Sequence, residues 1–173
     1  MSNCKKCQSN QVETFKDDEI LLYKGIQLPY RAEYSVCQNC GREFVSTVQI
    51  KANDCRVREA KKAYDGLLLA SEIKDAREKL NLTQEQAALV FGGGKKAFSK
   101  YERGEVSQSV AMDTLIRVYL NNPKIFKKRL AEVGLISAFI QVAKQNIIYQ
   151  KQQKTVKLRL VKSFPSKQEL KYG

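Results

Sequence analysis

Four of the five cysteines form two pairs with the same spacing, Cys4-x-x-Cys7 and Cys37-x-x-Cys40. Two residues between cysteines allow both sulfurs of a pair to reach one ion from a tight turn, and two such pairs supply the four thiolates of a tetrahedral zinc site. Because four protein sulfurs leave no coordination position open for water, we expect one structural Zn²⁺ and no hydrolytic metal.

Free, redox-active or disulfide-bonded thiols are the alternative interpretation of these cysteines. A disulfide framework requires an oxidising compartment, and a thioredoxin-like site requires one C-x-x-C motif inside a βαβ pattern. The polar N-terminal segment lacks the apolar core of a secretory signal peptide, so we expect a reducing, cytoplasmic location without membrane insertion. Cys55 belongs to neither pair and is interpreted as a buried or inert thiol.

A second group of residues is typical of a helix-turn-helix. Thr83-x-x-Gln86 is a capping box that starts a helix, Gly92-Gly93-Gly94 ends it, and a basic segment follows around Phe98 and Tyr101. In a helix-turn-helix the second helix, called the recognition helix, lies in the major groove of DNA, where lysine favours guanine O6 and N7. The candidate DNA-binding residues are Gln84, Lys95, Lys96, Ser99, Lys100 and Arg103. An ordinary helical hairpin is the alternative interpretation.

Arg77 and Glu102 form a smaller candidate site. Each is expected on the side of its helix that faces the junction of the first and third helices of this domain. We predict a structural ion pair that holds the recognition helix, and its contribution would be positional, since a buried pair is weak evidence for stability.

Charge and composition limit the class of function. The net charge is +13, and residues 133–173 contribute eight basic residues and one acidic residue to it. Such a surface attracts polyanions without separating DNA from RNA. The chain contains no histidine, the commonest general base and a usual ligand of open zinc sites, so we do not expect an enzyme.

Residue patterns predict an α+β fold with a small Cys4 zinc-bound β domain, an all-α five-helix helix-turn-helix domain and a basic C-terminal extension. In the first part we expect short antiparallel strands at residues 12–15, 20–26 and 30–36, broken by turn signals at Asp17-Asp18 and Pro29, with a possible addition at 44–48. Asn53 is the predicted N-cap of a connecting helix. Gly104 suits the position after the recognition helix, and Pro123 suits the start of the fifth helix. The predicted segments are 1–52 for the zinc domain, 53–70 for the connecting helix and linker, 71–132 for the helix-turn-helix domain and 133–173 for the extension.

The extension itself has two patterns. Residues 136–147 fit an amphipathic helix, and residues 156–160 alternate apolar and basic side chains as a strand would. A dimerisation arm, an extra DNA-contacting strand and a disordered basic tail are equally consistent with these patterns.

The two motifs together resemble the MqsA-type antitoxins, which join a YgiT-type zinc domain to an Xre-like helix-turn-helix. The similarity covers residues 4–131 and is most specific in Leu82-Thr83-Gln84, Phe91-Gly92-Gly93-Gly94 and residues 97–104. It implies a homodimeric type II antitoxin whose zinc domain neutralises a ribonuclease toxin and whose other domain represses its own operon at a palindromic operator on double-stranded DNA. The family pattern has Asn and Arg where this chain has Lys96 and Lys100, so we expect a different operator sequence.

Two other functions fit the same motifs. A regulator of a phage or mobile-element operon would have the same build without a toxin partner. RNA binding is a further alternative, suggested by the basic extension.

Overall fold

A computed structural model of the chain describes residues 3–137, 140, 141 and 148. The chain divides into two compact units, Met1–Phe126 and Lys127–Gly173. Both candidate sites lie in the first unit. Within the described residues, no helix has the length and apolar character needed to cross a membrane.

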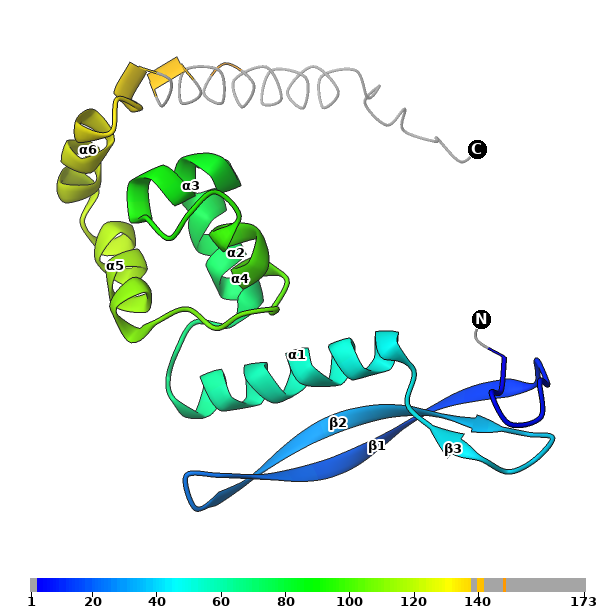
Figure 1. Cartoon of the computed structure of the whole chain (residues 1–173). Helices are drawn as coiled ribbons and strands as arrows, with labels where there is room; N and C mark the ends of the chain where they lie inside the picture. Colours follow the sequence, from blue (N-terminus) through cyan, green and yellow to red (C-terminus); the bar gives the residue numbers. More distant parts are fainter. Residues whose placement is uncertain (1–2, 138–139, 142–147, 149–173) are drawn as a thin grey trace, which may run out of the picture. The chain divides into compact units, whose positions relative to one another are not determined.

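A long hairpin forms the N-terminal part of the first unit (Figure 1). Strands β1 (Val12–Tyr23) and β2 (Ile26–Cys37) pair antiparallel along their whole length, and the short β3 (Glu43–Phe44) adds to β2 at Ser35 and Val36. Lys24 and Gly25 form the turn, with φ of 50° and 80°. Two residues with positive φ are what a tight type I′ hairpin turn requires.

The predicted breaks inside this hairpin were wrong. Asp17 and Asp18 lie within β1, and Pro29 lies within β2 opposite Ile20. Antiparallel pairs alternate between hydrogen-bonded and non-hydrogen-bonded, and counting from the Tyr23–Ile26 pair beside the turn places Pro29 in a non-hydrogen-bonded pair. No β3 residue pairs with this part of β2, so the missing N–H of Pro29 leaves no ladder bond unmade. The predicted addition at 44–48 is also shorter than expected, since β3 ends at Phe44.

Helix α1 (Thr47–Tyr64) begins earlier than the sequence patterns suggested. Ser46 is its N-cap: the Ser46 hydroxyl accepts from the Gln49 N–H, and the Gln49 side chain accepts from the Ser46 N–H. The prediction of Asn53 as N-cap was therefore wrong. Ser46-x-x-Gln49 is the same kind of capping box that predicts the helix start at Thr83.

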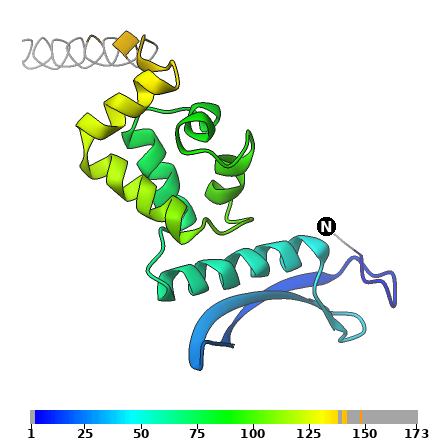
Figure 2. The same cartoon turned by 60° about the vertical axis from the view of Figure 1, so that its left-hand side comes forward.

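Asn53 instead joins α1 to the sheet. Its side-chain oxygen accepts from the Glu33 backbone N–H at 2.8 Å, and its side-chain nitrogen donates to the Glu33 carbonyl at 2.9 Å. Nearer the start of the helix, Gln49 donates to the Ser35 hydroxyl. Figures 1 and 2 show the result, in which α1 runs along the twisted hairpin.

The remaining helices are α2 (Ala70–Lys79), α3 (Gln84–Phe91), α4 (Ala97–Glu102), α5 (Val110–Asn121) and α6 (Pro123–Glu132). Thr83 and Gln86 form the predicted capping box at the start of α3, and Gly104 has a φ of 67° just after α4. Pro123 begins α6 as expected. Because α6 crosses the boundary between the two compact units, the packing of all five helices into one bundle stays a prediction.

The core of this region is built by apolar side chains from α2, α3, α4 and α5. Ile73, Phe98 and Ile116 are fully buried, and the Phe91 ring lies 5.3 Å from Phe98 and 5.4 Å from Tyr119, centroid to centroid. Burying aromatic rings of this size is the main stabilising contribution available to so small a helical region. The core fixes α4 against α2 and α3, which sets the direction of its exposed face.

The segment between α1 and α2 is also fixed. The Leu68 N–H donates to Asp113, the Leu68 carbonyl accepts from Gln108, and the Gly66 carbonyl accepts from Arg117. The linker predicted within residues 53–70 therefore corresponds to a short segment that is hydrogen-bonded to α5 and to the loop before it. The predicted strand at 156–160 and most of the predicted helix at 136–147 lie outside the described residues.

Candidate functional site

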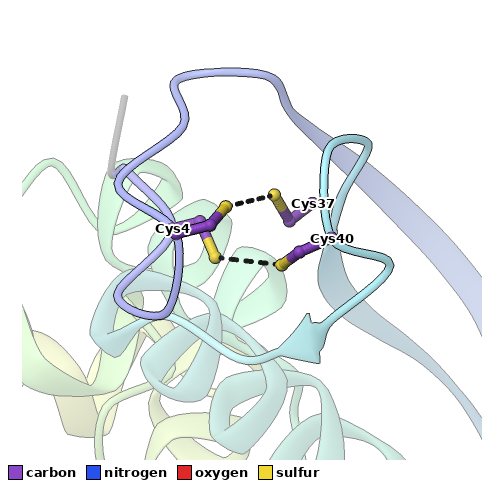
Figure 3. A group of neighbouring side chains, drawn as sticks. Cys4, Cys37 and Cys40 are labelled. Atoms are coloured by element: carbon purple, nitrogen blue, oxygen red, sulfur yellow. Dashed lines mark hydrogen bonds between the residues drawn. The ribbon is translucent and has the colours of Figure 1, made fainter.

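Both cysteine pairs meet at one place (Figure 3). The sulfurs of Cys4 and Cys40 are 3.7 Å apart, those of Cys7 and Cys37 are 3.5 Å apart, and all four lie within 4.8 Å of one another. In a tetrahedral site with Zn–S bonds of about 2.3 Å, neighbouring sulfurs are about 3.8 Å apart. The observed spacings therefore suit an ion at the centre of the four sulfurs.

The two chelating turns have the same backbone structure. In the first turn, the Cys4 N–H donates to the Ser9 carbonyl and the Gln8 N–H donates to the Cys4 carbonyl. In the second turn, the Cys37 N–H donates to the Arg42 carbonyl and the Gly41 N–H donates to the Cys37 carbonyl. Gln8 and Gly41, each four residues after the first cysteine of its pair, both have positive φ, at 60° and 67°. Two equivalent loops thus approach the sulfur cluster, one from before β1 and one from after β2.

Backbone N–H groups point at the sulfurs and favour their ionised form. The Ser9 N–H, assisted by the Asn39 side chain, lowers the pKa of Cys7 to about 6, and the Cys7 and Lys6 N–H groups lower the pKa of Cys4. At Cys40 the Arg42 N–H also lowers the pKa, but burial and the three neighbouring sulfurs outweigh it and raise the pKa to about 11.

Four thiolates this close repel one another, so a cation is needed to hold all of them ionised. A bound divalent metal supplies that charge, and a soft ion such as zinc matches an all-sulfur ligand set. Cys4 and Cys37 are fully buried, and Cys7 and Cys40 are partly buried. The residues present therefore fit a structural metal ion, and Cys55 lies outside the cluster.

The second candidate site lies at the turn between α3 and α4. Gly92, Gly93 and Gly94 all have positive φ, which allows the chain to reverse without a steric penalty. Lys95, Lys96 and Lys100 are exposed and line a hollow of about 280 Å³ together with Tyr101 and Val106. The structure thus brings together three of the six predicted DNA-binding residues.

Lys95 forms a 3.3 Å ion pair with Glu85, but both side chains are more than two-thirds exposed. An exposed ion pair of this kind contributes little to stability, and Lys95 can readily exchange Glu85 for another anion. Lys96 and Lys100 form no ion pair within the described residues. These three ammonium groups are therefore free to meet a polyanion.

The other predicted DNA-binding residues have partners of their own. Arg103 donates to Glu105 through two nitrogens and to the Ser99 hydroxyl through the third. Glu105 in this arrangement raises the pKa of Arg103 and neutralises part of its charge. Gln84, on α3, donates to Glu102 at 2.9 Å. The sequence predicts one shared basic face for all of these residues except Gln84, which it places on the preceding helix. In the structure the three lysines gather at the hollow, Arg103 and Ser99 contact each other, and Gln84 contacts Glu102.

Glu102 connects α2, α3 and α4. Arg77 donates to it through two nitrogens, at 2.6 and 3.0 Å, and both side chains are largely buried. Burial raises the pKa of Glu102, but the hydrogen bonds from Arg77 and Gln84 outweigh this effect and hold the pKa below its usual value. The carboxylate is therefore ionised at neutral pH and fixes the last turn of α4.

Both candidate sites lie in the part of the chain that is similar to known proteins. A family model described as the antitoxin component of a bacterial toxin-antitoxin system, MqsA, matches residues 2–129. The chain belongs to the MqsA antitoxin family. It is 25% identical over 127 residues to the antitoxin MqsA of Escherichia coli (strain K12), in an alignment that covers 72% of this chain and 97% of that protein.

The MqsA family match includes the four cysteines and the whole of α3 and α4, and it ends within α6. Residues 130–173 therefore lie beyond the part that this chain shares with the family model. The extension is the part of the chain for which family membership offers no guide.

One residue near the C-terminal end of α4 in this MqsA-family chain was missed at the sequence level. Arg58, on α1, donates from Nε to the Gly104 carbonyl at 2.8 Å, just beyond the C-terminus of α4. Its position in the sequence gives no signal for this contact, because the two residues are 46 apart and belong to different predicted domains.

Proposed function

We propose that this chain is a type II antitoxin that binds one structural Zn²⁺ through Cys4, Cys7, Cys37 and Cys40, neutralises a toxin through the zinc-bound β domain, and represses its own operon as a DNA-bound homodimer in the cytoplasm. Membership of the MqsA family supports the antitoxin role. The metal proposal rests on the sulfur spacing, which suits zinc.

The observation that carries the DNA-binding proposal is the gathering of Lys95, Lys96 and Lys100 around one hollow at the glycine turn. In a helix-turn-helix this end of the second helix enters the major groove, and lysines there bind guanine edges or phosphates. Ser99 lies between Lys96 and Lys100, and Arg103 lies three residues beyond Lys100; both would contact the flanking DNA backbone. Gln84 would bind phosphate through the one side-chain N–H that its bond to Glu102 leaves over.

The hairpin supports a protein partner for the zinc domain. β1 is an edge strand of the described sheet, and its Ile20 and Leu22 side chains are 64% and 72% exposed. Exposed apolar side chains beside an unpaired strand edge are typical of a surface that another chain covers. We propose this surface as part of the toxin interface.

A gel-shift titration with duplex DNA from upstream of the protein's own gene tests the DNA role. Changing Lys95, Lys96 and Lys100 together to Ala should abolish binding while leaving the circular dichroism spectrum unchanged. A control with three lysines changed elsewhere, at Lys16, Lys61 and Lys124, loses the same charge and should retain most of the affinity. Equal loss in the two triple variants would show that net charge, and not this site, determines binding.

Two further experiments separate the alternatives. Competition between the duplex and a structured RNA distinguishes DNA binding from RNA binding. Co-expression with the product of the adjacent reading frame tests the toxin role, and failure to form any complex would favour a regulator without a toxin.

In a dimer on DNA, the two recognition helices should meet half-sites about 34 Å apart.

A further inference from the structure

The turn that follows α4 contains two carbonyls, those of Arg103 and Gly104, that accept hydrogen bonds from another helix. The Glu105 N–H donates to the Lys100 carbonyl and the Gly104 N–H donates to the Tyr101 carbonyl. This is the Schellman pattern, which satisfies the earlier carbonyls of the last turn. The carbonyls of Arg103 and Gly104 come after it and need donors from elsewhere.

Helix α1 supplies both donors. Arg58 Nε donates to the Gly104 carbonyl at 2.8 Å, and the Cys55 thiol makes a weaker contact of 3.6 Å with the Arg103 carbonyl. Arg58 also reaches the Cys55 sulfur through its Nη2, which holds the guanidinium over the end of α4. A cation at this end is favourable because the helix dipole is negative there.

Close packing reinforces these hydrogen bonds. Gly104 is buried, and a Cβ atom on it would lie 3.7 Å from the Cβ of Cys55, 3.8 Å from Glu59 Oε1 and 3.9 Å from the Cβ of Ala70. Glu59 itself accepts from the Ala70 N–H and from Lys62. The turn after α4 therefore rests directly on α1 and on the first residue of α2.

A neighbouring arginine on α1 makes contacts on the opposite side. Arg56 donates to Glu33 and to Asn53, so that it binds the sheet and, within the described residues, forms no hydrogen bond or ion pair with α4. Arg56 and Arg58 thus have the same charge and lie two residues apart on one helix, but they hold different elements. Substituting Arg56 therefore removes contacts with the sheet, whereas substituting Arg58 removes the contact with the end of α4.

We propose that Arg58 is a positioning residue for DNA recognition, which fixes the C-terminal end of α4 from the connecting helix so that Lys96 and Lys100 keep one orientation towards the groove. This inference rests on the DNA-binding function proposed above. It makes the connecting helix part of the DNA-reading unit, although none of its residues needs to touch DNA.

A direct phosphate contact by Arg58 would also lower affinity when the residue is changed, and salt dependence separates the two roles. Loss of a phosphate contact reduces the slope of log K against log salt by about 1, because fewer counterions are released. Loss of a positioning contact lowers affinity and leaves the slope unchanged. The readout is therefore the slope together with the affinity.

The experiment compares Arg58→Ala, Arg58→Lys and Arg56→Ala with the wild-type chain, using fluorescence anisotropy on the operator duplex at several salt concentrations. We expect Arg58→Ala to bind about tenfold more weakly, the effect of losing one charge-assisted hydrogen bond, with an unchanged slope. Arg58→Lys, which keeps a cationic donor, should recover part of the loss, and Arg56→Ala should bind like the wild type.

Amide hydrogen exchange provides a second measurement that does not depend on DNA. The Gly104 and Glu105 amides should exchange faster in Arg58→Ala than in Arg56→Ala. Unchanged affinity in Arg58→Ala, or a slope reduced by about 1, would overturn the positioning role. If the wild-type chain binds no DNA, the proposed function fails and the DNA role of Arg58 fails with it, whereas the exchange result still decides whether Arg58 holds the end of α4.

Discussion

Arg77 and Glu102 form a two-point ion pair, with Arg77 Nε 2.6 Å from Glu102 Oε1 and Nη2 3.0 Å from Oε2. Arg77 also donates through Nη1 to the Leu82 carbonyl, just before α3 begins. Gln84, the first residue of α3, donates to the same carboxylate. Three helices are thus joined at one carboxylate on the inner side of α4, so this pair should matter for stability and, if α4 binds DNA as proposed, for DNA binding too.

Changing Glu102 to Gln should lower the free energy of unfolding at pH 7 by about 2 kcal/mol, because Arg77 then stays largely buried without a charged partner. Urea unfolding followed by circular dichroism measures this difference. Glu78 is the matched control, since it lies 3.4 Å from Arg77 with a side chain that is about half exposed. Glu78→Gln should cost less than about 0.5 kcal/mol, and an equal loss in both variants would contradict the role of Glu102.

The same pair predicts a pH dependence. The pKa of Glu102 is lower in the folded chain than its usual value, so its contribution to stability is fully present above that usual value and is lost as the pH falls through the folded pKa. The difference in unfolding free energy between the wild type and Glu102→Gln should therefore shrink when unfolding is measured at progressively lower pH, below about 4. A difference of constant size between pH 7 and pH 3 would assign the effect to packing.

Metal binding should depend on the paired cysteines and not on Cys55. Cys37→Ser removes one buried ligand, so the purified variant should contain less than one zinc per chain by mass spectrometry and should lose the fold of residues 3–45. Cys55→Ser, the control, should keep one zinc per chain. Because protons compete with the metal for thiolates, acidification should release zinc from the wild type. An intact hairpin without zinc would refute the structural role of the metal.

The sequence predicted the parts of the fold that depend on local chemistry. Repeated C-x-x-C spacing identified the four cysteines that the structure brings together, and the capping box at Thr83 identified the start of α3. These signals are strong because each arises within four or five residues. The ion pair of Arg77 with Glu102 was also anticipated, because helical periodicity determines which side of each helix faces the other.

Contacts between distant segments could not be predicted in the same way. Asp17, Asp18 and Pro29 resemble turn residues, but β1 and β2 form an exposed hairpin in which charged side chains and a proline cost little. Asn53 resembles an N-cap because its side chain suits any unpaired backbone group, and here the group is on β2. The role of Arg58 likewise depends on how α1 packs, which no local pattern records.

Asn53 should stabilise the attachment of α1 to the sheet. Asn53→Ala removes the donor and the acceptor that satisfy the Glu33 backbone, and we expect a loss of about 2 kcal/mol in unfolding free energy. Asp54 is the adjacent control, exposed on the same helix, and Asp54→Ala should change stability by less than about 0.5 kcal/mol. Thermal unfolding of the zinc-bound proteins measures both, and similar melting temperatures for the two variants would contradict this role.

The glycine turn should tolerate side chains unequally at its second and third positions. Gly93 and Gly94 have φ of 95° and 84°, so an alanine at either position is strained by about 1 kcal/mol. A Cβ on Gly93 would in addition lie 3.2 Å from the Cβ of Ala97, the first residue of α4, whereas one on Gly94 would meet no atom within 4 Å. Gly93→Ala must therefore push against the start of α4, and Gly94→Ala need not. We expect Gly93→Ala to unfold at lower urea concentration and to bind the operator more weakly than Gly94→Ala. Equal losses in the two variants would show that backbone strain alone, and not the approach of Gly93 to α4, sets the requirement for glycine.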